Sequence, residues 1–275
     1  MNMKIKSNPF LYIGALLFGL MAALIILGYF WTPYDPTAMA AKKFLAPSAE
    51  HILGTDNFGR DIFSRVIDGA GTTFFIALSV VAIGCVAGII IGSLCGYYGG
   101  LPDLILTRVC DSITAFPAFL LALVVVSVAG SGTYNIILAL GVLFTPSFAR
   151  IVRGEFARCR ELNYIKSARL MGAGDFSIMF RHILPNVFSL LLVSMTLDFA
   201  TCMLTESTLS YLGFGIPLPT PTWGNLLNGA NNSVVIQQYW WRWVFPAVIF
   251  GACTICINLI GDGLRDAIDP KSVER

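Results

Sequence analysis

Two acidic residues inside a long apolar run, Asp198 and Glu206, are the side chains of this sequence best placed to do chemistry. An ionisable group in an apolar helix is costly to bury and usually faces a cavity, a partner or an ion path. The two lie eight residues apart, about two helical turns, with Cys202 between them, so all three share roughly one helix face. We expect Asp198, Cys202 and Glu206 to line a path that a cationic group could cross. A second interpretation stays open, in which Glu206 braces the segment around Trp223.

Other kinds of chemistry find little support in the sequence. The two histidines, His51 and His182, are far apart in sequence, which argues against a histidine-built catalytic or metal site. The sequence contains no GxxxxGK[ST] motif, so we expect no nucleotide hydrolysis through a P-loop in this chain. Cys253 and Cys256 have CxxC spacing without a second pair, so we interpret them as packing residues. We therefore expect no catalysis, no metal and no cofactor in this chain. The net charge of +2 gives no reason to expect a nucleic-acid partner.

The elements that must position these residues are membrane-spanning helices. Hydrophobic residues make up 56% of the chain and charged residues 12%, and the mean hydropathy is +0.74. A bilayer core roughly 30 Å thick needs about 20 apolar residues per helix. Runs of this kind predict six spans, at 10–31, within 69–102, two within 112–149 that break at 129–132, at about 183–212 and at 243–261. The sequence therefore predicts an all-α polytopic membrane protein with six transmembrane helices.

The basic residues predict how these spans are oriented. Lys and Arg are enriched on the cytoplasmic side of membrane proteins, and a cytoplasmic N-terminus places thirteen of the 18 basic residues on that side. We therefore expect both termini and the block 161–185 to be cytoplasmic. The first apolar run is longer than the roughly 7–15 residues usual in a signal peptide, and no small-residue cleavage site follows it, so we expect it to be retained.

The block 161–185 combines basic residues with helical periodicity. Residues 163–170 are compatible with a helix, Gly172 and Gly174 allow a sharp turn, and 176–182 are again amphipathic. The pattern predicts a short docking helix that lies nearly parallel to the membrane. The apolar residues available to a partner are Tyr164, Ile165, Ala168, Leu170 and Met171. The other interpretation is an interfacial loop whose arginines contact anionic lipid.

Turn-forming residues precede the second span, on the side predicted to be outside. Asp56 and Asp61 each belong to a glycine-containing turn, where carboxylates can accept backbone amides or pair with Arg60 and Arg65. We expect these contacts to anchor the loop structurally.

Four motifs in a fixed order carry a family resemblance. The first lies at 51–65, the second in the cytoplasmic block, and the last two at 206–225 and 258–270. The cytoplasmic motif reads Tyr164-Ile-x-Ser-Ala-Arg-x-x-Gly172, followed by Ile-Leu-Pro185, and resembles the EAA loop of ABC importer permeases. Together the motifs resemble the second permease subunit of dipeptide, oligopeptide and nickel importers. The resemblance covers nearly the whole chain and implies the type I ABC importer permease fold.

The resemblance also implies roles for residues in these motifs. The short helix of the EAA loop docks on an ATPase subunit, and the positions that match it are Tyr164, Lys166, Ser167, Ala168, Arg169 and Gly172. Contact with an extracytoplasmic binding protein is implied for Asp56, Arg60, Asp61 and Trp223. Lys166 departs from the pattern, because this position is usually acidic and the next is commonly alanine. The departure puts in doubt a fixed salt bridge from Lys166 to the ATPase.

An assembly is implied as well. The chain would form half of a pore with a homologous second permease subunit, in a bacterial cytoplasmic membrane and in contact with its lipid. Two ABC ATPase subunits that bind ATP and Mg would drive it, and a substrate-binding protein would feed it by alternating access. We divide the chain into a first helix with an extracytoplasmic segment at 1–68, a five-helix core at 69–265 with the coupling helix near 161–182, and a cytoplasmic tail at 266–275.

Two alternatives remain at this point. Peptide and nickel importers share the four motifs, and the lack of histidines in the spans favours di- or oligopeptides over nickel or a metal chelate. A stand-alone secondary transporter or channel would also show apolar spans with buried acids. No inverted repeat is evident among the six spans, and a long basic cytoplasmic block has no purpose without a partner.

Overall fold

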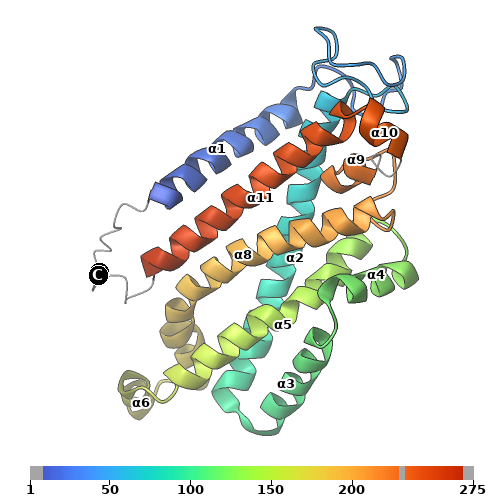
Figure 1. Ribbon diagram of the computed structural model, residues 1–275. Coiled ribbons are helices and arrows are strands. Elements are labelled where there is room, and N and C mark those ends of the chain that lie inside the picture. Colours follow the sequence, from blue (N-terminus) through green and yellow to red (C-terminus); the bar gives the residue numbers. More distant parts are fainter. Residues whose placement is uncertain (1–8, 229–232, 269–275) are drawn as a thin grey trace.

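The computed structural model describes residues 9–228 and 233–268, and within them the chain is helical, with no β-strand (Figure 1). The elements in chain order are α1 (Pro9–Phe30), α2 (Ile62–Tyr98), α3 (Gly100–Thr114), α4 (Ala118–Ala129), α5 (Thr133–Cys159), α6 (Asn163–Leu170), α7 (Asp175–Ser177), the π-helix η1 (Ile178–Ile183), α8 (Leu184–Tyr211), α9 (Trp223–Asn228), α10 (Ser233–Gln238) and α11 (Trp241–Ile268). The all-α prediction is confirmed.

Several of these helices can cross a membrane. Four continuous helical segments are long and apolar enough to do so: α2, α5, the run from α7 through α8, and α11. The α3–α4 pair is a fifth if it counts as one span. The 22 residues of α1 coincide with the first predicted span and include no charged residue. These segments agree with a polytopic protein. Each of the six predicted spans overlaps a helix, although within the described residues only four or five segments meet the length and hydropathy expected of a span.

The third predicted span differs from the single helix expected. α3 and α4 meet at 90°, because Pro117 lacks a backbone amide and disfavours helical geometry in the residue before it. α3 also begins at Gly100, well before residue 112, and carries charged residues. Uncharged runs alone therefore predict a later start for this element than the structure has.

α2 is the longest helix and packs closely against α5. Four glycines at spacing four, from Gly84 to Gly96, face α5 along this contact. A Cβ at Gly88 would lie 2.4 Å from Phe148 Cβ, and one at Gly92 would lie 2.5 Å from the Ala149 carbonyl oxygen. Small residues of this kind let two membrane helices approach closely. α2 and α5 therefore form the closely packed centre of the molecule. The domain boundary expected after residue 68 falls inside α2.

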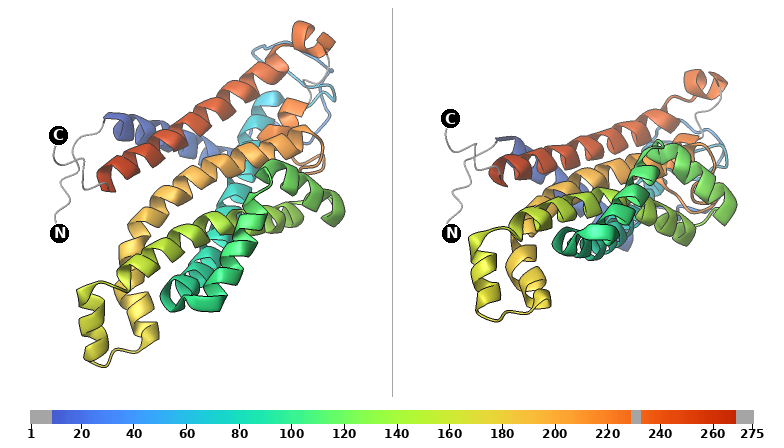
Figure 2. Two further views of the ribbon diagram at one scale, coloured as in Figure 1. Left: turned by 60° about the horizontal axis from the view of Figure 1, so that its bottom comes forward. Right: turned by 90° about the horizontal axis from the view of Figure 1, so that it is seen from below.

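The remaining long helices flank this pair. α1 packs on α11 and α2, and α8 packs on α11, α2 and α5 (Figures 1 and 2). The segment 31–61 lies at one end of the molecule together with α9 and α10, whereas α6 and the turn after it protrude at the other end. The two groups of predicted partner contacts are thus separated by the length of the helices.

Candidate coupling site

The protruding segment around α6 is built as the sequence predicts, with helix bounds Asn163–Leu170. Gly172 follows with φ +86°, a left-handed conformation that glycine adopts without the penalty of a side chain. Pro185 lies in the first turn of α8, where its missing amide is not needed. The chain therefore reverses direction at Gly172 and returns through α7 and η1 to α8.

One face of α6 is used inside this chain. Ile165 and Ala168 are 1% and 4% exposed, and Ile165 belongs to a core cluster with Ile178 and Met179 of η1. The expectation that these two residues are available to a partner is wrong, because they join α6 to the returning segment. Their spacing of three residues places both on the inner helix face.

Other large apolar side chains of this hairpin are exposed to the surroundings. Leu170, Met171 and Phe176 are 89%, 82% and 75% exposed, and Tyr164 is 44% exposed. We call these four residues the apolar tip. Large apolar side chains gathered on a protruding element mark an interaction surface. Phe176 was not among the predicted site residues, although its place in the amphipathic run 176–182 was a signal.

The polar residues of α6 are partly engaged within the chain. Lys166 is exposed and its ammonium lies 3.6 Å from a carboxylate oxygen of Glu161. Ser167 is exposed as well, next to the tip. Arg169 donates a hydrogen bond of 2.7 Å to the hydroxyl of Tyr97, at the end of α2. Lys166 and Arg169 therefore have polar partners within the chain and are also exposed at the surface.

The predicted path residues are not all on a surface. Asp198 is half-buried and accepts a hydrogen bond of 2.9 Å from the Ser147 hydroxyl of α5. Cys202 and Glu206 are 0% exposed. Neither lines a path on the surface of this chain, which corrects the prediction for both. They share a helix face as expected, but that face points into the bundle. In the described part of the chain, no group of three or more His, Cys, Asp and Glu residues is arranged to hold a metal ion.

The residues predicted to contact an external partner are buried too. The Asp56 carboxylate accepts from the Phe58 and Arg60 amides, at 2.7 and 3.0 Å, and from Arg60 Nε at 2.7 Å. Asp61 is the N-cap of α2, accepting from the Ser64 amide at 2.8 Å, and lies 2.9 Å from His51 Nδ1. These side chains cannot touch a partner directly, because the loop folds over them.

Trp223 occupies the centre of the same end of the molecule. It is fully buried, and its indole Nε1 donates 2.9 Å to the Val66 carbonyl of α2. Its ring packs edge-on against Phe74 and Phe250. Arg65, expected from sequence only as an ion-pair partner of the nearby aspartates, connects α2 to the segment after α1, to the loop before α9 and to the turn at Asp56. It donates to the carbonyls of Pro36 and Pro219 and lies 3.8 Å from Asp56.

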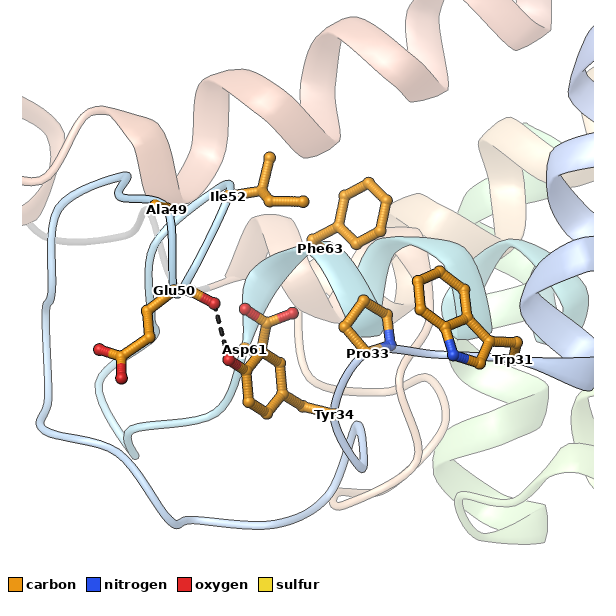
Figure 3. A pocket seen from close by; sticks show the side chains of 8 residues that line it. All are labelled: Trp31, Pro33, Tyr34, Ala49, Glu50, Ile52, Asp61 and Phe63. Carbon is orange, nitrogen blue, oxygen red and sulfur yellow. Dashed lines mark hydrogen bonds between the residues drawn. The ribbon is translucent and has the colours of Figure 1, made fainter.

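A hollow of about 370 Å³ lies at this end of the molecule (Figure 3). Trp31, Pro33 and Tyr34 follow α1, Ala49, Glu50 and Ile52 come from the loop, and Asp61 and Phe63 begin α2. The Tyr34 hydroxyl donates 2.7 Å to the Glu50 carbonyl and fixes the loop against the segment after α1. Of the four predicted residues only the buried Asp61 lines this hollow, and its exposed rim comes from residues such as Trp31, Glu50 and Ile52.

A bundle of apolar helices with one protruding helical hairpin is the architecture of a multi-pass membrane protein. Residues 88–273 match the family described as binding-protein-dependent transport system inner membrane component. The chain belongs to this family of ABC transporter permeases and is a multi-pass inner-membrane protein.

Curated relatives agree with this membership. The glutathione transport system permease protein GsiD of Pectobacterium atrosepticum is 41% identical over 259 residues, covering 92% of this chain and 85% of the relative. A candidate peptide transport system permease protein of Brucella suis biovar 1 is 41% identical over 261 residues, covering 94% and 87%. A second candidate peptide permease of the same organism is 37% identical over 275 residues, covering 97% and 90%. The match extends over both the 31–61 segment and the α6 hairpin.

Proposed function

We propose that this chain is one of two pore-forming subunits of an ATP-driven importer, and that α6 docks on a cytoplasmic ATPase subunit. The apolar tip carries this proposal, because three large apolar side chains more than 70% exposed at the end of the bundle need a partner. Tyr164, Lys166, Ser167, Arg169 and Gly172 would lie at that contact. Ala168 would support it from inside, since it holds α6 against the returning segment.

The mechanism we propose is alternating access. ATP-driven closure of two ATPase subunits would move α6, and the helices joined to it would open the pore to the outside. ATP and Mg would bind to those partner subunits, and this chain would carry out no catalysis itself. Both termini and α6 would lie in the cytoplasm, as the distribution of Lys and Arg favours.

At the other end we propose contact with an extracytoplasmic substrate-binding protein. Its contacts would be with exposed residues of the 31–61 segment, such as Met39 and Glu50. Asp56, Arg60, Asp61 and Trp223 would act indirectly, by holding that segment in place.

For the substrate we propose di- or oligopeptides. The names of the relatives, which refer to peptide or glutathione transport, support this choice over nickel. Uptake of a labelled tripeptide compared with uptake of nickel by the complete transporter decides between the two.

Gly172→Asp tests the docking role. An L-residue at φ +86° strains the turn, and the added carboxylate lies beside the apolar tip. We expect ATP hydrolysis to continue while uptake falls at least tenfold, with the protein still present in the membrane. Gly174→Asp is the matched control, because it adds the same charge at an exposed position with φ −72°. Unchanged uptake in Gly172→Asp refutes the proposal.

Co-purification separates this function from a stand-alone transporter or channel. Extraction of the tagged chain in mild detergent should bring down an ATPase and a second permease. Recovery of neither, from membranes that transport normally, favours the stand-alone alternative.

A further inference from the structure

Tyr97, in the last turn of α2, connects the protruding hairpin to the centre of the molecule. Its side chain is 6% exposed and belongs to the same core cluster as Ile165 of α6 and Ile178 of η1. The neighbouring Tyr98 is instead 58% exposed. Of these two tyrosines at the helix end, only Tyr97 points into the contact with the hairpin.

The Tyr97 hydroxyl binds residues on both sides of the Gly172 turn. It donates to Asp175 Oδ1 at 2.6 Å and accepts from Arg169 Nη2 at 2.7 Å. Arg169 also lies 3.7 Å from Asp175, and its guanidinium stands 5.6 Å from the Tyr97 ring centroid. The three side chains, which we call the Tyr97 network, therefore form a closed triangle across α2, α6 and α7. Hydrogen bonds to charged groups are the stronger kind in proteins.

The backbone around Tyr97 is held from a second direction. Arg160, which follows α5, donates to the carbonyls of Gly96 and Tyr97 at 3.4 and 3.2 Å. Carbonyls in the last helical turn have no partner within the helix, so a guanidinium there stabilises the helix end. A Cβ at Gly96 would lie 2.5 Å from the Arg153 carbonyl, which shows how closely this end of α2 lies on α5. A displacement of Tyr97 must therefore move the end of α2 itself.

From this arrangement we infer that Tyr97 transmits movement of α6 to α2, and so to the helices that pack on α2. The inference rests on the proposed docking of α6 on an ATPase. Without the Tyr97 network, the turn at Gly172 and the π-helix η1 could absorb the movement, since π-helical turns interrupt regular helix hydrogen bonding. With the Tyr97 network in place, Arg169 and Asp175, on the two sides of the turn, are hydrogen-bonded to the same hydroxyl. Tyr97 is thus a positioning residue for coupling and touches no substrate.

The test uses the complete transporter in liposomes, with a reporter cysteine in α2. Leu94→Cys is suitable because Leu94 is 47% exposed near the end of α2, while all seven native cysteines are buried. The rate of labelling by a maleimide is measured with and without ATP. In Tyr97→Phe we expect the ATP-dependent change in rate to fall roughly tenfold, because the hydrogen bonds to two charged groups are lost while the ring remains. ATPase co-purification should not change.

Two further variants make the outcome specific. Tyr98→Phe removes a hydroxyl from the same helix turn that makes no hydrogen bond with any described residue, and it should keep the full ATP response. Asp175→Asn removes the charge of an exposed residue, so it should leave the core intact. The double variant with Tyr97→Phe should lower the ATP response no further than Tyr97→Phe alone, because both changes act on the same network. A full response in Tyr97→Phe with the ATPase bound overturns the inference and leaves the docking proposal intact. No ATP response in the unmodified reporter protein counts against the docking proposal itself.

Discussion

At the scale of single residues, burial and hydrogen bonding decide what Glu206 does. Its carboxylate accepts from Ser210 at 2.7 Å and from Ser207 at 3.4 Å. The Ser210 hydroxyl in turn accepts from the Ile216 amide at 3.4 Å. A Cβ at Gly224 would lie 2.4 Å from the Ser207 carbonyl oxygen, so α9 presses directly on this part of α8. Of the two interpretations from sequence, the geometry favours bracing of the segment around Trp223.

Substitution of Glu206 distinguishes bracing from a role in the transport path. Glu206→Ala leaves the Ser207 and Ser210 hydroxyls without their acceptor, and buried unsatisfied groups cost on the order of 1–3 kcal/mol each. We expect less folded protein in the membrane and a lower unfolding temperature. Glu206→Gln keeps an acceptor oxygen and the side-chain volume, and should retain both folding and uptake per folded complex. A Gln variant that folds normally but does not transport would assign Glu206 to the path.

The roles of Asp61 and Asp56 as hydrogen-bond acceptors in turns could be predicted from the sequence, whereas their burial and the role of Tyr97 could not. The capping by Asp61 and the pairing of Asp56 with Arg60 follow from turn residues adjacent in sequence, and local patterns of this kind can be read directly. The burial of these groups could not be predicted, because it depends on loop segments that fold over them. Tyr97 gave no signal at all, since its partners Arg169 and Asp175 lie 72 and 78 residues away.

At the scale of elements, α3 has its polar face toward the protein and its apolar face outward. Asp103 forms a two-bond pair with Arg153 of α5, with Nη2 donating to Oδ2 at 2.8 Å and Nε donating to the other oxygen. Asp111 accepts from Arg150 of α5 at 3.3 Å. Leu101, Leu104, Ile105 and Val109 are exposed on the other side. A helix of this kind suits a membrane protein, where the surroundings are apolar and polar groups find partners inside.

Arg153→Ala should loosen α3 from α5. Because the Arg153 side chain is 39% exposed, the expected loss of stability is modest, about 1 kcal/mol, as for partly solvated ion pairs. Thermal unfolding of the purified protein measures it. Arg150→Ala should have a smaller effect, since both partners in that pair are more than half exposed. Exchange of the charges in the first pair, Asp103→Arg with Arg153→Asp, should recover most of the stability lost in Arg153→Ala. Failure to recover it contradicts a role for this charge pair.

Elements with strong local signals were predicted well. α6 has the predicted bounds because Gly172 and Gly174 end its pattern, and α1 matches its uncharged run. α3 was missed because Asp103, Arg108 and Asp111 made residues 100–114 look too polar for a span. Its two aspartates are paired with arginines of α5, which lie 39 and 50 residues further along the chain. Pairing over such distances has no local signature.

At the scale of the whole molecule, the two proposed partner surfaces lie at opposite ends of one helical bundle. The 31–61 segment, α9 and α10 form one end, and the α6 hairpin forms the other (Figure 1). α2 runs from the first end, where Asp61 caps it, to the second, where Tyr97 lies. A single helix therefore connects the two proposed partner surfaces. Its close packing on α5 at Gly88 and Gly92 joins it to that helix along their contact.

This arrangement predicts on which side of the membrane each end can be labelled. Met39 in the 31–61 segment is 61% exposed and Met171 in the apolar tip is 82% exposed, while all seven native cysteines are buried and should react little. With a membrane-impermeant maleimide, we expect Met39→Cys to be labelled in right-side-out vesicles and Met171→Cys only in inside-out vesicles. The unsubstituted protein is the control for background. Addition of the ATPase should then protect Met171→Cys in inside-out vesicles, because docking covers the apolar tip. Labelling of Met171→Cys from the outside would reverse the proposed orientation and remove the basis for docking on a cytoplasmic partner.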